Sequence, residues 1–172
     1  AILLGIVQGI TEWLPISSTG HMILVDEIWP MNMSEEFVDL FLVVIQFGSI
    51  LAVVVLFWHT LWPFSRRKTK EERKETWLLW AKIIVAVIPA GVLGVLFDDY
   101  IDALLYNATT VAIALIVYGV LFLMIENHPR QPKVTEMKQL SFPHAFLIGV
   151  FQCLALIPGT SRSGSTILGA VV

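Results

Sequence analysis

The chain is poor in charge: only 15% of its 172 residues are Asp, Glu, Lys or Arg, against roughly 25% in an ordinary soluble domain. With 56% hydrophobic residues, a fold of this size has too little polar surface to face water. The single cysteine, Cys153, excludes an intrachain disulfide and a thiolate metal cluster. A net charge of −3 provides no excess of basic residues, so nucleic acid is not an expected partner. The composition is typical of an integral membrane protein surrounded by lipid.

Three stretches are apolar and long enough to cross a bilayer core of about 30 Å, which needs roughly 20 residues of helix. They are residues 37–58, 77–97 and 108–125. Two further apolar segments, residues 1–28 and 142–172, are interrupted by proline and by polar runs, and each is predicted to form a helix, a break and a helix. The expected fold is all-α: a single polytopic membrane domain with two broken, re-entrant helical segments.

Basic residues occupy alternate connections. Residues 59–76 contain six Lys or Arg and residues 126–141 contain three, whereas residues 26–36 and 98–107 contain none. Basic connections stay on the cytoplasmic side of a membrane. The sequence therefore predicts a multi-pass protein of the inner (plasma) membrane whose acidic connections face outward.

The two broken segments resemble each other. Residues 5–8 (Gly-Ile-Val-Gln) match residues 149–152 (Gly-Val-Phe-Gln), and Pro15 matches Pro158, each followed by a run rich in Ser, Thr and Gly. Three predicted spans, an odd number, separate the copies, so the second copy enters from the opposite face. Inverted repeats with paired broken helices point to a binding site near the middle of the membrane. The first copy is predicted to enter from outside and the second from the cytoplasm.

The first break carries groups suited to an anion. Gln8 and Glu12 are four residues apart and share one helix face. An ionised carboxylate inside an apolar helix costs about 2.5–3.5 kcal/mol on insertion scales, so Glu12 indicates either a functional site or a buried ion pair. A helix starting after Pro15 would direct its positive end at a bound anion. Hydroxyls and backbone N–H groups come from Ser17, Ser18, Thr19 and Gly20.

His21 closes this polar run, and an imidazole there can transfer a proton or attack phosphorus. A structural hydrogen bond is the simpler role for a lone histidine beside an apolar helix. Gln46, a polar residue within the first span, is expected to form a hydrogen bond to another helix. The remaining histidines lie in or beside the basic connections and are expected at the surface: His59, His128 and His144.

Arg162 is the most informative residue of the second break. A guanidinium stays charged and needs an anion when buried, and its fork fits phosphate oxygens in a bidentate way. A structural ion pair with Glu12 is the alternative. Five hydroxyls surround the arginine within seven residues, from Thr160, Ser161, Ser163, Ser165 and Thr166. Together the two breaks predict a phosphate site.

The two polar stretches resemble the signatures of the bacterial undecaprenyl-diphosphate phosphatases linked to bacitracin resistance. Residues 8–21 (QGITEWLPISSTGH) are similar to the first signature and residues 158–166 (PGTSRSGST) to the second, and the spans between them also fit. The resemblance implies hydrolysis of undecaprenyl diphosphate to undecaprenyl phosphate and inorganic phosphate, which recycles the lipid carrier for cell-wall synthesis. Because members of this family continue beyond the second signature, the chain is expected to be an N-terminal fragment of about two thirds of a whole protein.

The resemblance also implies an inverted-repeat fold, a site open to the outer face, a homodimer, and dependence on Mg²⁺ or Ca²⁺. Glu12, His21 and Arg162 match residues needed for activity in the family, and Glu12 is a possible metal ligand. Family members carry either Glu or Gln at the position of Gln8. Because this chain has Gln there, a metal site with two carboxylates is disfavoured. Phosphate contacts are expected from Gln8, Ser17, Thr19, Ser161, Ser163 and Thr166.

The residues leave two mechanisms open. Either His21 attacks the terminal phosphorus, or Ser18 attacks while His21 protonates the leaving phosphate. Glu12 would orient His21 or take up a proton, and Arg162 would hold the diphosphate. A transporter or flippase for an anionic lipid or solute is the alternative function, because broken inverted repeats are also transporter architecture.

Overall fold

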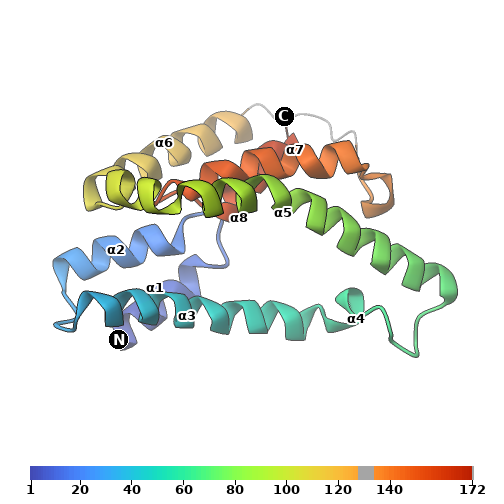
Figure 1. Ribbon diagram of the computed structural model, residues 1–172, viewed down its shortest axis with the longest axis horizontal. Helices are drawn as coiled ribbons and strands as arrows, with labels where there is room; N and C mark the ends of the chain where they lie inside the picture. Colours follow the sequence, from blue (N-terminus) through green and yellow to red (C-terminus); the bar gives the residue numbers. More distant parts are fainter. Residues whose placement is uncertain (128–133, 172) are drawn as a thin grey trace.

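The computed structural model describes residues 1–127 and 134–171, which form α-helices and two short 3₁₀ helices but no strand (Figure 1). This confirms the all-α prediction. In chain order the elements are α1 (Ile2–Thr11), α2 (Ser18–Ile28), α3 (Glu35–Leu56), α4 (Trp58–Leu61), α5 (Lys70–Leu105), α6 (Ala108–Glu126), η1 (Met137–Gln139), α7 (Phe142–Gln152), η2 (Cys153–Leu156) and α8 (Arg162–Val171).

The exterior of the molecule is apolar, and about half of the buried side chains are polar. The helices α3, α5 and α6 are long and apolar enough to cross a membrane, and their apolar stretches are almost wholly exposed. Among the described residues, eight polar side chains are buried but only seven hydrophobic ones. A water-soluble core shows the opposite preference. The chain is therefore an all-α polytopic membrane protein, with the exposed apolar helices facing lipid.

The second predicted span lies inside a much longer helix. The helix α5 has 36 residues, which at 1.5 Å per residue gives about 54 Å, well beyond the thickness of a bilayer core. A capping box starts it early: the Thr69 hydroxyl accepts from the N–H of Glu72 at 3.2 Å, and the Glu72 carboxylate accepts from the N–H of Thr69 at 2.6 Å. The last part of the connection predicted over residues 59–76 is therefore helical.

Aromatic side chains join α4 to α5 at the basic end of the molecule. The rings of Trp58 and Trp62 stack with centroids 4.8 Å apart, and Phe64 meets the edge of Trp77 at 5.7 Å. The indole N–H of Trp80 donates to a backbone carbonyl of α4 at 2.8 Å. Tryptophans gathered at one level are typical of a membrane–water interface.

The second basic connection is described in part. Lys138 of η1 forms an ion pair with Glu75 of α5 at 2.8 Å, and this contact raises the pKa of the Lys138 ammonium. His59 and His144 are exposed, as predicted. The remaining residues used in the sequence analysis of this connection lie outside the described part of the chain: His128, Arg130 and Lys133.

Both apolar segments that contain proline are broken helices. Pro15 lies in the turn between α1 and α2, and Pro158 lies between η2 and α8. The helices after the breaks begin in the same way: the Ser17 hydroxyl accepts from the N–H of Gly20 at 3.1 Å, and the Ser161 hydroxyl accepts from the N–H of Gly164 at 3.1 Å. The two capping serines stand 144 positions apart, the offset that also relates residues 5–8 to residues 149–152.

The two breaks pack against each other through glycines. A Cβ atom on Gly20 would lie 3.0 Å from the Cα of Gly159, and a Cβ atom on Gly164 would lie 3.0 Å from the backbone oxygen of Pro15. Each helix start thus touches the opposite break. Such reciprocal contacts are expected when two equivalent units meet about a two-fold axis. Entry of the two copies from opposite membrane faces stays a prediction.

Of the glycines at the two breaks, Gly159 has the least room for a side chain. Its φ of +90° disfavours any side chain, and an added Cβ would lie 2.7 Å from the backbone oxygen of Val111 in α6.

We expect Gly159→Ala to destabilise the protein by about 2 kcal/mol or more, measured as a lower midpoint of thermal unfolding of the purified protein in detergent. Gly9→Ala, in open space on α1, is the matched control and should melt no lower than the parent. Equal melting of the two variants would show that Gly159 does not pack this closely against the backbone of α6.

Candidate functional site

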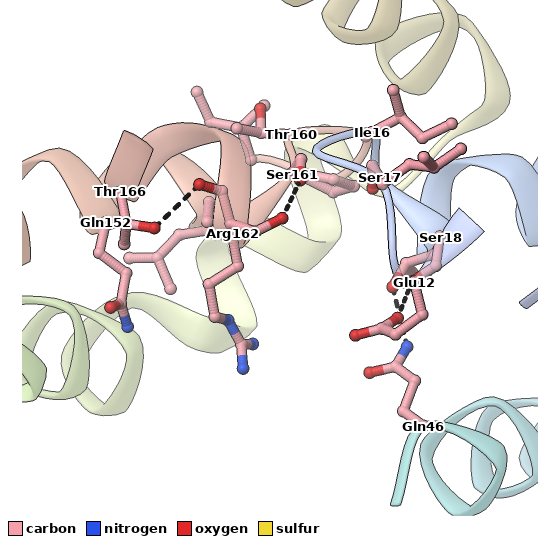
Figure 2. Close-up of a pocket in the computed structure, with 18 of the residues that line it drawn as sticks. Glu12, Ile16, Ser17, Ser18, Gln46, Gln152, Thr160, Ser161, Arg162 and Thr166 are labelled. Carbon is pink, nitrogen blue, oxygen red and sulfur yellow. Dashed lines mark hydrogen bonds between the residues drawn. The ribbon is translucent and has the colours of Figure 1, made fainter. Parts of the chain in front are cut away.

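One pocket, with a volume of about 520 Å³, lies where the two breaks meet (Figure 2). This is within the usual range of small-molecule sites, roughly 300–1,000 Å³. Its walls come from the first break, from the segment joining α7 to α8, from α3 and from the end of α5. The polar side chains belong to Glu12, Ser17, Ser18, Thr19, Gln46, Asp102, Tyr106, Gln152, Thr160, Ser161, Arg162, Ser163 and Thr166.

The structure brings most of the predicted site residues to this pocket. Two predicted residues, Gln8 and His21, lie outside its lining. Those that line it are Glu12, Ser17, Ser18, Thr19, Ser161, Arg162, Ser163 and Thr166.

Ser18 and Glu12 form a hydrogen-bonded pair at the first break. Glu12 ends α1, and Ser18, which is buried, is the first residue of α2. The turn containing Pro15 folds the chain back, so that the Ser18 hydroxyl donates to the Oε2 atom of Glu12. A hydroxyl bonded to a carboxylate has an acceptor in place for its proton. Ser18 is therefore the side chain of the first break best arranged to act as a nucleophile.

Arg162 lies on a different side of the pocket from this pair (Figure 2). It is the first residue of α8, and its side chain is exposed toward the open space. Within residues 1–127 and 134–171, no hydrogen bond or ion pair engages its guanidinium. The alternative of a structural ion pair with Glu12 is wrong for this conformation. The guanidinium is thus available to a ligand anion.

Both helix starts contribute to an environment that favours negative charge. The helices α2 and α8 each begin at the pocket, where unpaired backbone N–H groups and the positive end of the helix dipole favour anions. The hydroxyls of Ser161 and Ser163 lie 3.0 Å apart, and that of Thr166 donates to the carbonyl of Ser163 at 2.9 Å. The Thr160 hydroxyl is buried and lacks a partner in the described structure, a state that costs about 1–3 kcal/mol.

Gln8 lies behind Glu12. The side chain is 3% exposed, and its Nε2 atom lies 2.8 Å from the Ser49 hydroxyl and 3.4 Å from the Oε2 atom of Glu12. The carboxamide thus contacts the carboxylate from the side away from the pocket. In this position it supports Glu12, and direct phosphate binding by Gln8 stays a prediction.

His21 lies one turn beyond Ser18 on α2. Its Nδ1 atom is 2.7 Å from the backbone oxygen of Ser17. Because a carbonyl only accepts, this contact requires the ring hydrogen to be on Nδ1. The observed ring position corresponds to the structural role considered for this histidine, and its catalytic role stays a prediction.

Four polar lining residues were neither predicted as site residues nor counted among the hydroxyls around Arg162. Gln46 forms the predicted hydrogen bond to another helix, donating to the Thr19 hydroxyl at 2.8 Å, and it also lines the pocket. Gln152 is the repeat equivalent of Gln8, so the internal repeat could have identified it. Asp102 and Tyr106 lie at the end of α5, and no motif marks them.

A divalent cation would find oxygen ligands here. Within the described residues no three His, Cys, Asp or Glu side chains gather into a metal cluster. Mg²⁺ in phosphate-processing sites is commonly held by one or two carboxylates together with the substrate phosphates. The Glu12 carboxylate and the neighbouring hydroxyls fit that requirement.

Fold and pocket together define an all-α, multi-pass membrane protein with a polar pocket between two broken helices. The profile of the family described as bacitracin resistance protein BacA matches residues 1–172, and the chain belongs to this family. Similar curated proteins are undecaprenyl-diphosphatase 1 of Clostridioides difficile (strain 630), at 60% identity, and the undecaprenyl-diphosphatase of Enterococcus faecalis (strain ATCC 700802 / V583), at 57%. Each alignment covers 100% of this chain and 63% of the relative, so the chain spans less than two thirds of their length.

The planar guanidinium of Arg162 leads to a prediction about pyrophosphate binding. We expect Arg162→Lys to weaken the binding of inorganic pyrophosphate by about tenfold, because lysine keeps the charge but loses the bidentate geometry. Isothermal titration of the purified protein with pyrophosphate measures this. The exposed Arg66 lies on the connection before α5, and Arg66→Lys is the matched control with unchanged affinity. An unaltered affinity in Arg162→Lys would mean that a point charge is sufficient.

Proposed function

We propose that this protein hydrolyses undecaprenyl diphosphate to undecaprenyl phosphate and inorganic phosphate in the pocket between the breaks. The observation that carries the proposal is the Ser18–Glu12 hydrogen bond in the same pocket as the unpaired Arg162. A nucleophile with its proton acceptor, placed across from a cation, is suited to phosphoryl transfer. Membership of the BacA family and the names of the similar undecaprenyl-diphosphatases support the same substrate.

In the first step the Ser18 Oγ atom attacks the terminal phosphorus. Its proton passes to Glu12, an O–P bond forms to Ser18, and the bond from the phosphorus to the bridging oxygen breaks. Undecaprenyl phosphate leaves with that oxygen. Arg162 and the N-termini of α2 and α8 stabilise the charge on the phosphate oxygens, which is the main contribution of protein groups to phosphoryl transfer.

In the second step water attacks the phosphoserine. The bond between phosphorus and Ser18 breaks, and Glu12 returns its proton to the serine oxygen. Inorganic phosphate leaves carrying the oxygen of the water. The sum of the two steps consumes one water for each diphosphate cleaved, and Ser18 and Glu12 return to their starting states.

Mg²⁺ or Ca²⁺, when bound, would supply additional neutralisation of the diphosphate charge. Glu12 is the residue we propose to hold it, together with oxygens of the substrate. Ser17, Thr19, Ser161, Ser163 and Thr166 would then orient the phosphates through their hydroxyls or backbone N–H groups.

We further propose that the pocket opens to the outer face of the plasma membrane. Asp102 and Tyr106 line it, and both lie at the connection between α5 and α6 that lacks Lys and Arg. The opposite end of α5 carries the basic connection. The lipid chain would lie along exposed apolar residues beside the first break, such as Leu14 and Ile16.

Removal of the nucleophile should abolish turnover and spare binding. We expect Ser18→Ala to lower kcat for phosphate release from undecaprenyl diphosphate at least a hundredfold, with pyrophosphate affinity within about threefold of the parent. Phosphate release by the purified protein and calorimetric binding measure the two effects. Normal turnover in Ser18→Ala would exclude the serine mechanism. A parent protein that binds pyrophosphate but releases no phosphate would instead favour the transporter.

The covalent intermediate separates the serine and histidine mechanisms. With substrate labelled in the terminal phosphate, a rapid acid quench should retain label on the protein, because phosphoserine is stable in acid. Phosphohistidine loses its phosphate under the same treatment but survives in alkali. Label that survives only in alkali would assign the attack to His21, and His21→Ala should then be the variant without label.

A further inference from the structure

The helix α3 contacts polar groups on both sides of the first break. Ser49 of α3 bonds to Gln8 of α1, and Gln46 of α3 donates to Thr19 of α2 at 2.8 Å. The two α3 residues are three positions apart, so they share one helix face. This helix therefore holds the parts of the chain that carry Glu12 and Ser18.

Ser49 holds the Gln8 carboxamide in place beside Glu12. Its hydroxyl lies 2.8 Å from the Nε2 atom of Gln8 and 3.2 Å from the Oε1 atom. The Nε2 atom also lies 3.4 Å from the Oε2 atom of Glu12, and that same oxygen accepts from the Ser18 hydroxyl. Ser49, Gln8, Glu12 and Ser18 thus form one continuous chain of contacts from α3 to the pocket.

The orientation matters because the two ends of a carboxamide are opposite in character. With its NH₂ group toward Glu12, Gln8 donates to the carboxylate; with its oxygen there, two acceptors would face each other. Gln8 is 3% exposed, so water offers little alternative pairing. In the described structure, Ser49 is the residue besides Glu12 whose side chain bonds to this carboxamide.

We propose that Ser49 is a positioning residue for catalysis: it anchors the Gln8 carboxamide beside Glu12, whose carboxylate accepts from the NH₂ group, and thereby keeps that carboxylate on the Ser18 hydroxyl. The inference rests on the proposed function, because it assumes that Glu12 accepts the serine proton. Neither Ser49 nor Gln8 lines the pocket. The contribution of Ser49 therefore belongs to the chemical step and not to substrate binding.

The first test separates kcat from KM for undecaprenyl diphosphate in the intact protein. We expect Ser49→Ala to lower kcat about fivefold to tenfold, the effect of losing one hydrogen bond, with KM unchanged within about twofold. Ser49→Thr, which keeps the hydroxyl, should restore most of the rate. Ser34→Ala is the matched control, because Ser34 precedes the same helix and makes no side-chain capping hydrogen bond.

The second test asks whether Ser49 acts through Gln8. In a Gln8→Ala background, Ser49→Ala should cause no further loss of kcat, because the effects of two substitutions do not add when one residue acts through the other. The inference is overturned if Ser49→Ala leaves kcat unchanged, if Ser49→Thr is as slow as Ser49→Ala, or if the losses multiply in the double variant. A lower melting temperature with unchanged kcat would reduce the contact to helix packing. A parent protein that releases no phosphate overturns the proposed function itself, whereas an active parent with an equally active Ser49→Ala overturns this inference alone.

Discussion

The structure depends on the close approach of two pieces of irregular backbone inside an apolar molecule. Backbone groups away from water must be paired or covered, and here each break is covered by the other, with Gly20 against Gly159 and Gly164 against Pro15. Side chains larger than hydrogen at these points would separate the breaks and the pocket walls with them. The pocket is thus a direct product of backbone packing, and its polar side chains take positions that the packing has already set.

The polar groups of the pocket are positioned by the local structure at the start of each helix that follows a break. A serine caps each new helix, so the next residue inward, Ser18 or Arg162, stands at the pocket with the helix start behind it. The long helices contribute few polar groups: Gln46 and Ser49 of α3 bond to residues of α2 and α1, and Asp102 of α5 lines the pocket. Lipid can surround this arrangement because the apolar stretches of α3, α5 and α6 are exposed and the polar side chains of the first break are largely buried.

Much of this architecture follows from the sequence, because proline, apolar length and the internal repeat act locally. Pro15 and Pro158 mark the breaks, and the two polar runs after them identify most of the pocket. Features that depend on tertiary packing were not predicted. Asp102 and Tyr106 reach the pocket because of the path of α5. For His21 the sequence left a structural and a catalytic role open, because it does not give the rotamer that turns the ring to the backbone oxygen of Ser17. The early start of α5 was readable from Thr69 and Glu72, but their charged surroundings suggested a loop.

Ser18 and Arg162 occupy the same place in the two copies, 144 positions apart, each directly after a capping serine. The two equivalent positions carry groups of opposite chemical character: a hydroxyl bonded to a carboxylate in the first copy and a guanidinium cation in the second. The reciprocal packing of the two breaks brings both groups to the same pocket. The two positions are therefore not interchangeable: the first copy has no guanidinium at this place, and the second copy has no hydroxyl there.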